Sequence, residues 1–202
     1  MKIICIGRNY ENHAKEMNAS VPSSPIFFMK PDTALLRDGN DFYHPDFSND
    51  IHYECELVVK INKVGKNIQE KFARKYYNQI SLGLDFTARD VQSKCKKNSH
   101  PWEIAKSFDC SAAISNEFID INNFSDEIIF DLAKNGEVVQ IGNSADMIFS
   151  IDALIAYISK FITLKVGDLI YTGTPAGVGS VKIGDKLKGT LEGRTMFEFE
   201  IK

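Results

Sequence analysis

The sequence predicts a mixed α/β fold in which strands predominate. Short apolar runs rich in β-branched and aromatic residues are separated by glycines, most densely toward the C-terminus. Only a few segments have the apolar periodicity of a helix, and they do not alternate regularly with the strands, so a regular βαβ sheet is not expected. At 202 residues, 44% of them hydrophobic, the chain can bury a sizeable core. We therefore expect residues 1–202 to form a single domain.

The first half of the chain contains both strand-like and helix-like segments. Apolar runs predict strands at residues 2–7, 25–31, 53–62 and 81–86. Apolar spacing and polar faces predict helices at residues 9–18, 68–80 and 88–97. Asn9 is expected to cap the first of these helices, while Thr87 and Asp90 resemble a capping box for the third.

The second half contains the clearest local signals. Asn135-Gly136 lies between two apolar runs in residues 128–142 and predicts a tight hairpin. Residues 150–162 predict a helix capped by Ser150, with isoleucines and a leucine along one face. The remaining segments, interrupted by glycines, predict short strands within 166–173, 174–179, 182–193 and 195–202.

Charge and composition exclude several classes of protein. The net charge of −3 argues against nucleic acid as the main partner, because phosphate binding requires a basic face. No apolar run approaches the roughly 20 residues of a membrane span, and the N-terminus lacks the features of a secretory signal. The four cysteines form no C-x-x-C pair. We interpret them as reduced thiols and expect a cytoplasmic protein without a membrane partner.

The stretch HYECEL places Glu54 and Glu56 two residues apart in an expected strand, where both side chains point to one face. An edge strand with both carboxylates in water is one interpretation. The apolar neighbours Cys55 and Leu57 suggest instead a strand covered on both faces. A third acid, Asp85, ends another apolar strand, and three such carboxylates suit a hard divalent cation such as magnesium. Spacing alone does not decide between these interpretations.

Other residues could carry chemistry, although each also has an ordinary structural explanation. His13 and Glu16 can meet on one helix face, which would orient the imidazole as a general base. Lys106, in an apolar context, could stabilise an oxyanion or be a surface lysine. The stretch YTGTPAGVG, residues 171–179, could approach a ligand through backbone N–H groups or form a simple turn between strands. Residues 95–97, CKK, are expected to lie on the polar face of a helix.

Seven segments in order resemble the fumarylacetoacetate hydrolase family, in particular its acylpyruvate hydrolase and oxaloacetate decarboxylase branch. They are GRNYENHAKEM, FFMKP, HYECELVV, LDFTARDVQ, PWEIAKSFD, MIFSI and GDLIYTGTPAGVG, and they cover nearly the whole chain. The resemblance implies a β-sandwich roll like the C-terminal domain of that family, with a short N-terminal lid helix in a segment of about residues 8–25. It also implies a homodimer and a bound Mg²⁺ or Mn²⁺, for which Ca²⁺ can substitute in crystals.

The resemblance also implies roles for individual residues. The metal ligands would be Glu54, Glu56 and Asp85. The catalytic residues would be His13, Glu16 and Lys106. The residues in contact with the substrate's carboxylate and keto oxygens would be Arg89, Gln92 and Thr174. By strand alternation Cys55 would face away from the metal and serve packing.

The implied activity is cleavage of the C–C bond of acylpyruvates by water, giving pyruvate and a carboxylic acid, with oxaloacetate decarboxylation at the same site. Keto–enol tautomerisation of oxaloacetate uses the same enolate and is an alternative. So is isomerisation or hydration of a longer 2-oxo dicarboxylic acid in aromatic catabolism. A metal-stabilised dimeric binding module without catalysis is the alternative of a different class.

Overall fold

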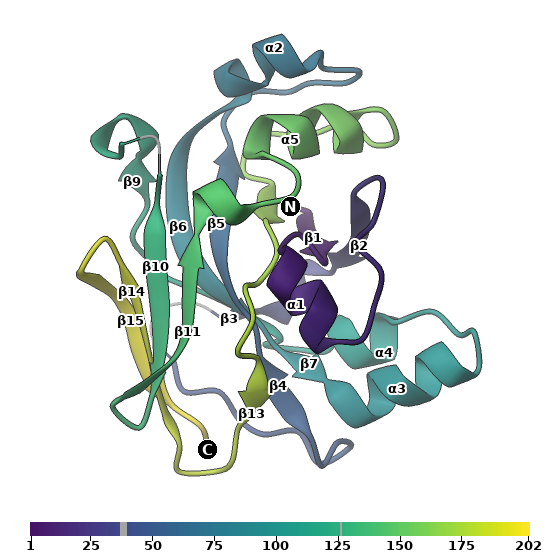
Figure 1. Ribbon diagram of the computed structural model, residues 1–202, viewed down its shortest axis with the longest axis vertical. Coiled ribbons are helices and arrows are strands. Elements are labelled where there is room, and N and C mark those ends of the chain that lie inside the picture. The colour runs from purple at the N-terminus through teal and green to yellow at the C-terminus, as the bar shows by residue number, and fades with distance from the viewer. Residues whose placement is uncertain (37–39, 126) are drawn as a thin grey trace.

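The computed structural model describes residues 1–36, 40–125 and 127–202 (Figure 1). In this part of the chain, strands form sheets of eight, four and three members. The strands are β1 Ile3–Gly7, β2 Ile26–Lys30, β3 Leu35–Leu36, β4 Ile51–Tyr53, β5 Cys55–Ile61, β6 Tyr77–Asp85, β7 Thr87–Ala88, β8 Ala112–Ile114, β9 Ile119–Asp120, β10 Ile129–Lys134, β11 Glu137–Asn143, β12 Leu169–Tyr171, β13 Gly179–Ser180, β14 Lys186–Leu191 and β15 Arg194–Glu200. The α-helices are α1 Glu11–Glu16, α2 Glu70–Ala73, α3 Arg89–Lys97, α4 Glu103–Lys106 and α5 Ile151–Ser159. The predicted strand-dominated α/β fold is confirmed.

The largest sheet has the order β2-β1-β12-β5-β6-β8-β3, with β9 paired to β6. Its centre is the long antiparallel pair β5 and β6, in which Leu57 lies opposite Leu82 and Glu56 opposite Gly83. The second sheet has the order β11-β10-β14-β15, and the third joins β13, β4 and β7. The third sheet contains the strand that leads directly into β5.

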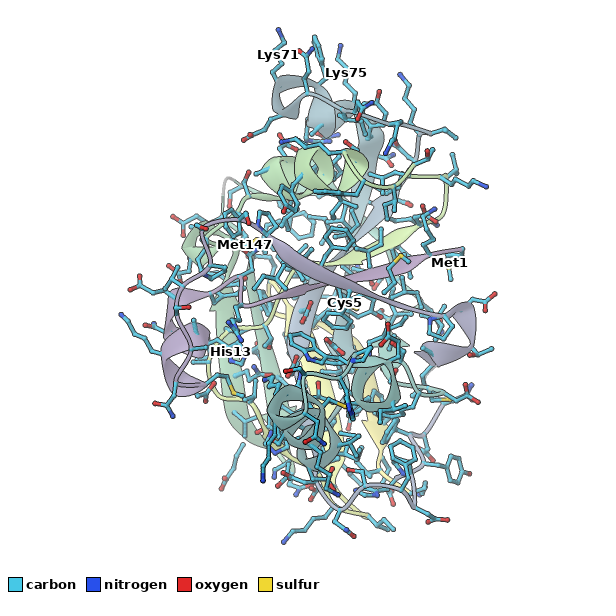
Figure 2. All side chains as sticks on the ribbon, turned by 90° about the vertical axis from the view of Figure 1, so that its right-hand side faces the viewer. Met1, Cys5, His13, Lys71, Lys75 and Met147 are labelled. Atoms are coloured by element: carbon cyan, nitrogen blue, oxygen red, sulfur yellow. The ribbon has the colours of Figure 1, made fainter. Side chains whose placement is uncertain are left out.

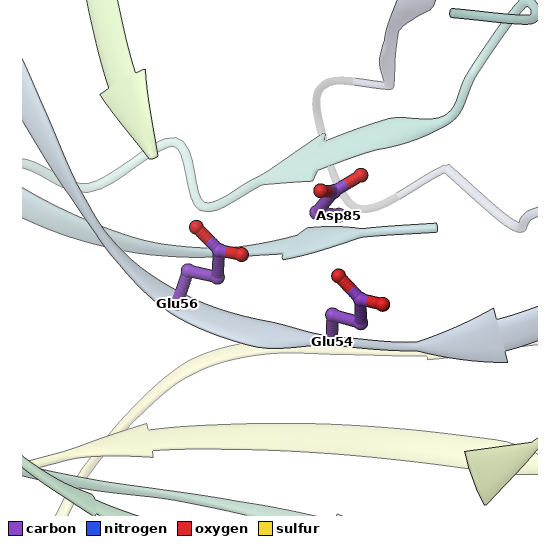
Figure 3. A group of neighbouring side chains, drawn as sticks. All are labelled: Glu54, Glu56 and Asp85. Carbon is purple, nitrogen blue, oxygen red and sulfur yellow. The ribbon is translucent and has the colours of Figure 1, made fainter. Parts of the chain in front are cut away.

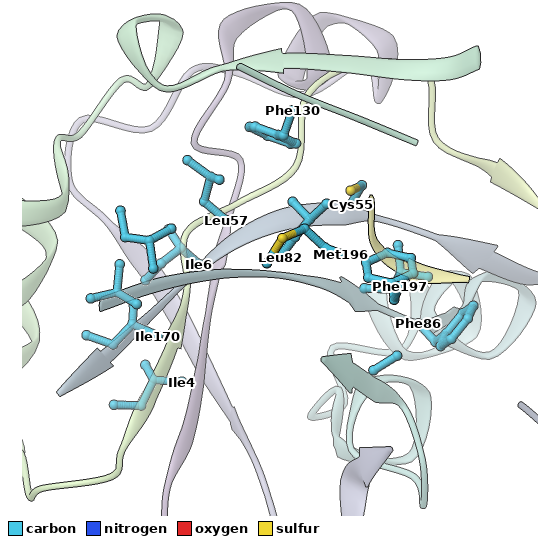
Figure 4. Close-up of a cluster of buried hydrophobic side chains, with 14 of the residues drawn as sticks. Ile4, Ile6, Cys55, Leu57, Leu82, Phe86, Phe130, Ile170, Met196 and Phe197 are labelled. Atoms are coloured by element: carbon cyan, nitrogen blue, oxygen red, sulfur yellow. The ribbon is translucent and has the colours of Figure 1, made fainter. Parts of the chain in front are cut away.

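The main core lies between the two larger sheets. From β5 the side chains of Cys55, Leu57, Val59 and Ile61 point into it, and from β6 those of Ile80, Leu82 and Leu84 (Figure 4). They pack against side chains from β10, β14 and β15, namely Phe130, Leu132, Leu187, Leu191, Phe197 and Phe199. The other face of β5 carries Glu56 and Val58, and Glu54 comes just before the strand. Val58 belongs to a separate, smaller cluster. One side of the central strands therefore serves packing and leaves the other side for polar groups.

Helices cover different parts of the main sheet. The helices α3 and α4 pack together and contact β2, β4 and β7. Helix α1, in the segment predicted to be a lid, follows three residues after β1, and Figure 1 shows it in front of the sheet between α5 and α3. At the other end α2 packs on α5, where Lys71 and Lys75 lie far from His13 (Figure 2). In the described part of the chain, no helix is long and apolar enough to cross a membrane.

The hairpin and the Ser150 cap are confirmed. Asn135 and Gly136 have positive φ angles of 54° and 87°, as a tight turn between β10 and β11 requires. The Ser150 hydroxyl accepts a hydrogen bond from the Ala153 N–H at 3.2 Å at the start of α5.

Apart from the strand expected within residues 174–179, of which only Gly179 belongs to a strand, three local predictions are wrong. Residues 68–80 form only α2 and a 3₁₀ turn at Arg74–Tyr76, because Tyr77 already begins β6 and pairs with β5. Thr87 pairs with His52 in a sheet, and α3 begins at Arg89 without a side-chain cap. Asn9 likewise does not cap α1, since its side chain is used elsewhere. In each case a contact distant in sequence overrides the local signal.

Candidate active site and metal centre

Three carboxylates meet on the face of the main sheet that points away from the core. Glu54 lies between β4 and β5, Glu56 is in β5, and Asp85 is the last residue of β6. All three are buried, and one oxygen from each lies within 4.8 Å of the others (Figure 3). The prediction that strand alternation brings the two glutamates together with Asp85 is confirmed.

Three cations face these carboxylates. Lys106 Nζ lies 2.8 Å from both Oε2 of Glu54 and Oδ2 of Asp85. Arg89 Nη2 lies 2.6 Å from the other oxygen of Glu54. Lys30 Nζ lies 2.8 Å from Oδ1 of Asp85. Protein cations therefore already neutralise part of the negative charge of this cluster, at Glu54 and Asp85.

Glu54 and Glu56 respond differently to this environment. Burial alone would raise the pKa of Glu54, but Lys106 and Arg89 outweigh it and hold that pKa far below its usual range. Burial, together with Asp85 and Glu54, raises the pKa of Glu56, whose carboxylate accepts a hydrogen bond from the Gly173 N–H at 2.7 Å. Burial would lower the pKa of Lys106, but Asp85 and Glu54 raise it. Lys106 is therefore a permanent cation, whereas Glu56 is the carboxylate with least compensation.

The residues fit a hard divalent cation. All three donors are carboxylate oxygens, the ligands that Mg²⁺ and Mn²⁺ prefer. Oδ1 of Asp85 is buried and has no well-directed hydrogen bond, despite the nearby Lys30 ammonium. The poorly compensated Glu56 gives a second reason to expect a cation there. Glu54, Glu56 and Asp85 are the residues that would hold it.

Lys30 is a site residue that the sequence reasoning missed. Besides its ion pair with Asp85, its ammonium donates hydrogen bonds to the Ser111 hydroxyl at 2.9 Å, to the Ser111 carbonyl at 3.0 Å and to the Lys106 carbonyl. It thereby connects the end of β2 to the backbone next to Lys106. A lysine that ends an apolar strand just before Pro31 was the available signal.

His13 and Glu16 form the predicted pair on α1. Nδ1 of His13 lies 3.0 Å from Oε2 of Glu16, and the imidazole is buried at the edge of the site. The other oxygen of Glu16 accepts a hydrogen bond from the Gly177 N–H at 3.0 Å. Because Nδ1 is occupied, Nε2 is the ring nitrogen left for a substrate or water.

The three expected substrate contacts line the same region. Arg89 Nη1 donates to Oε1 of Gln92 at 2.8 Å, which leaves the amide nitrogen of Gln92 available. Thr174 accepts a hydrogen bond at 2.9 Å from Gln140. The side-chain oxygen of Gln140 accepts a hydrogen bond from the Cys55 N–H at 2.9 Å. Gln140 therefore connects the loop that contains Thr174 to the start of β5, the strand that carries Glu56. Gln140 was not foreseen, whereas the packing role of Cys55 is confirmed.

Asn9 joins the base of the lid to the rest of the site. Its amide donates to the carbonyls of Phe149 at 3.0 Å and Thr172 at 2.8 Å, and its oxygen accepts from the Phe149 N–H at 2.8 Å. Gly173 has a φ of +101°, and a Cβ at this position would lie 2.6 Å from Cβ of Asn9. Only glycine therefore allows this loop to approach Asn9 and still donate to Glu56.

One cavity brings most of these groups together. Its lining residues are Ile6, Gly7, Arg8, His13, Met17, Ile26, Phe28, Glu54, Asp85, Arg89, Gln92, Lys96, Trp102, Lys106 and Thr174. Of the predicted site residues, Glu16 and Glu56 do not line it but contact residues around it. Lys96 also lines it, from an exposed position on α3, whereas Cys95 is buried, so the assignment of CKK to a polar helix face is wrong for Cys95.

Residues 2–202 match the family model described as the C-terminal domain of fumarylacetoacetate (FAA) hydrolase. The chain belongs to the fumarylacetoacetate hydrolase family. The resemblance drawn from the sequence motifs is confirmed, and this is a family of enzymes.

Named relatives within the fumarylacetoacetate hydrolase family carry out more than one reaction. The chain is 43% identical to the mitochondrial oxaloacetate tautomerase FAHD1 of Mus musculus, over 99% of this chain and 91% of the relative. It is also 43% identical to the oxaloacetate tautomerase YcgM of Escherichia coli, over 96% and 90%. The crystal structure of fumarylpyruvate hydrolase from Pseudomonas aeruginosa, in complex with Mn²⁺ and pyruvate, matches with a TM-score of 0.94 and 33% identity, covering 100% of this chain and 89% of that one.

Proposed function

We propose that this protein catalyses the keto–enol tautomerisation of oxaloacetate with the help of a divalent cation, Mg²⁺ or Mn²⁺. The observation that carries the proposal is the single cavity in which a carboxylate-oriented histidine faces a buried carboxylate cluster. The first feature suits proton transfer, and the second suits a cation that binds an oxo acid. When bound, the cation would act as a Lewis acid that lowers the energy of the enolate.

Substrate binding falls to residues that surround the carboxylates. Arg89 and the free amide of Gln92 are directed to the substrate's C1 carboxylate, and the Thr174 hydroxyl to its keto oxygen. Lys106 is held between Glu54 and Asp85 and adds positive charge where negative charge develops on oxygen. Lys30 positions Asp85 from behind and does not line the cavity.

Proton transfer falls to His13. Its Nε2 removes a proton from C3, and the electron pair of that C–H bond forms the C2=C3 double bond. The imidazolium then returns the proton to the keto oxygen, which gives the enol. Glu16 holds Nδ1 and stabilises the imidazolium between the two transfers. Gly177, through its N–H, keeps Glu16 in place.

Two further observations favour this reaction. The likeness to oxaloacetate tautomerases extends over nearly the full length of both chains at 43% identity. Tautomerisation also needs no water or other co-substrate beside the oxo acid, because only protons move. The likeness to fumarylpyruvate hydrolase is close in fold but lower in identity, at 33%.

Hydrolysis of acylpyruvates at the same site is the second candidate. The His13–Glu16 pair supports it, since an oriented imidazole can equally take a proton from a water that attacks the distal carbonyl. Lys106 would then stabilise the oxyanion. Decarboxylation of oxaloacetate would need neither water nor a general base, and only the stabilised enolate is common to all three reactions.

An assay on three substrates tests the proposal. Purified protein with Mg²⁺ is given oxaloacetate, acetylpyruvate and fumarylpyruvate, and kcat/KM is measured for enol–keto conversion, for C–C cleavage and for CO₂ release. We expect tautomerisation to be fastest and to be lost with a chelator. His13→Ala should lower tautomerisation and hydrolysis by about 10²- to 10⁴-fold and decarboxylation far less. Glu54→Ala should remove all activities and Mg²⁺ binding.

Clear results would contradict the proposal. Faster cleavage of acylpyruvates than tautomerisation would make the protein a hydrolase. Equal losses of all three activities in His13→Ala would refute its role as a base, and full activity of Glu54→Ala with chelator present would refute the metal site. Activity on a longer 2-oxo diacid alone would favour an isomerase or hydratase, and no activity at all a binding module. A homodimer remains a prediction, to be measured by light scattering.

A further inference from the structure

Two cations at the rim of the cavity have no role in the reaction described above. Arg8 and Lys96 line the same cavity as His13 and Asp85. Among the described residues, neither cation forms an ion pair or a hydrogen bond through its side chain with any other. The cations Lys30, Lys106 and Arg89 deeper in the site are, in contrast, each paired with a carboxylate. Arg8 and Lys96 are therefore free to bind an anion.

Lys96 is placed at the rim by helix α3. Arg89, Gln92 and Lys96 lie at positions i, i+3 and i+7, which share one helix face, and all three line the cavity. Seven residues of helix rise by about 10 Å, so Lys96 lies along the cavity from the end that Arg89 occupies. Its ammonium is 5.6 Å from the centre of the Trp102 ring, which also lines the cavity. The aromatic ring thus holds the amine at this rim.

Arg8 is held at the rim by its backbone. It has a φ of 59°, in the left-handed region that residues other than glycine seldom occupy. The preceding residue ends β1, and the following residue, Asn9, is fixed by three hydrogen bonds to Phe149 and Thr172. Backbone strain of this kind persists where the surroundings determine it, and it is concentrated at functional sites.

The charges around the cavity leave an excess of positive charge. Lys30, Lys106 and Arg89 equal the three carboxylates in number, so a bound divalent cation together with Arg8 and Lys96 would give the cavity an excess of positive charge. Partial burial, followed by Arg89 and Arg8, lowers the pKa of Lys96, as expected where like charges gather. A ligand with one carboxylate at the metal end would leave this rim unneutralised.

We infer that Arg8 and Lys96 form a second carboxylate subsite, which makes the cavity selective for 2-oxo diacids over 2-oxo monoacids. The inference rests on the proposed function in one respect: the 2-oxo carboxylate end of the ligand lies beside Arg89 and Gln92. The far carboxylate then reaches Lys96 along the face of α3 and is closed in by Arg8 from the lid side. These two residues determine specificity and take no part in proton transfer.

The test is a comparison of two ligands of equal length. In 2-oxoglutarate the chain ends in a carboxylate, and in 2-oxopentanoate it ends in a methyl group. Their affinities for the Mg²⁺-loaded protein are measured by calorimetry in the wild type and in Lys96→Gln. We expect the wild type to prefer the diacid, and Lys96→Gln to weaken diacid binding about tenfold, the effect of losing one charge-assisted hydrogen bond. Binding of the monoacid should change by less than about twofold.

A matched control and a second variant complete the experiment. Lys97→Gln removes the same charge from the next residue of α3, which is exposed and does not line the cavity, and it should leave both affinities unchanged. Adding Arg8→Gln to Lys96→Gln should remove the remaining preference. Because Lys96 is exposed, its substitution tests the subsite even if the change at Arg8 prevents folding.

Three outcomes would overturn the inference: equal affinities in the wild type, an equal loss for both ligands in Lys96→Gln, or the same loss in Lys97→Gln. The result is separable from the proposed function. A protein that prefers the diacid but does not tautomerise oxaloacetate has the subsite and another activity. A protein that tautomerises oxaloacetate without any such preference lacks the subsite.

Discussion

At the scale of single residues, the site is organised by charge. Glu54, Glu56 and Asp85 would repel one another, and Lys30, Lys106 and Arg89 lie against them at hydrogen-bonding distance. A buried network of this kind costs desolvation energy, and an apolar cluster of the same volume would often be more stable. Its presence is therefore better explained by chemistry than by stability.

Substitution of Lys30 measures how much the neighbouring cations stabilise the buried carboxylates. Lys30→Met should lower the free energy of unfolding by about 3 kcal/mol, because the change leaves Asp85 with one fewer partner and removes donors to buried carbonyls. Urea unfolding without metal measures this. Lys97→Met, at an exposed position, is the control. A loss no larger than that of the control would mean that Lys30 does not stabilise Asp85.

At Glu56 we expect a substitution that stabilises the fold to impair metal binding. It is buried beside two other carboxylates, and both burial and these neighbours raise its pKa. Glu56→Gln should therefore raise the free energy of unfolding by about 1 kcal/mol in the presence of a chelator, since it removes a like charge and keeps an acceptor for the Gly173 N–H. The same variant should lose the stabilisation that Mg²⁺ gives the wild type. A variant that is less stable without metal yet still stabilised by Mg²⁺ would contradict both expectations.

At the scale of elements, the lid is the part most dependent on outside contacts. Helix α1 has six residues, too few to be stable alone. Two contacts hold the helix: Asn9, just before it, donates a hydrogen bond to the Phe149 carbonyl, and Glu16, its last residue, accepts one from the Gly177 N–H. A ligand that contacts His13 would add a third contact.

This predicts that the lid becomes ordered over a bound anion. Amide hydrogen exchange of residues 8–25 should slow by about tenfold or more when Mg²⁺ and oxalate are added, since the ligand closes the cavity against α1. The β10–β11 hairpin, which does not line the cavity, is the internal control and should not change. Unchanged exchange in both segments would exclude a role for the lid in binding.

The elements also show what a sequence can and cannot predict. The meeting of Glu54 and Glu56 was predictable because strand alternation is local, and so was the pair His13–Glu16. The helix expected at residues 68–80 failed because pairing with β5 is distant in sequence. Lys30 and Gln140 were missed for the same reason: their partners, Asp85 and Thr174, approach only after the sheets have formed.

At the scale of the whole molecule, the two faces of β5 and β6 divide stability from chemistry. Leu57 and Leu82 are cross-strand partners that point into the core between the two large sheets, whereas Glu56 and Asp85 point the other way. A substitution on the core face should thus change mainly the free energy of unfolding, and one on the other face mainly metal binding and activity. Because the same backbone carries both faces, this separation has to be measured.

Leu82→Ala provides that measurement. The side chain is fully buried, so the change leaves a cavity and should lower the free energy of unfolding by about 3 kcal/mol. Mg²⁺ affinity and kcat should stay within about twofold of the wild type under conditions where the variant is folded, because the carboxylate cluster lies on the opposite face. Urea unfolding gives the first quantity, and calorimetry and steady-state kinetics give the others. A loss of metal affinity as large as the loss of stability would show that packing between the sheets also sets the geometry of the carboxylates, and that the two faces act as one unit.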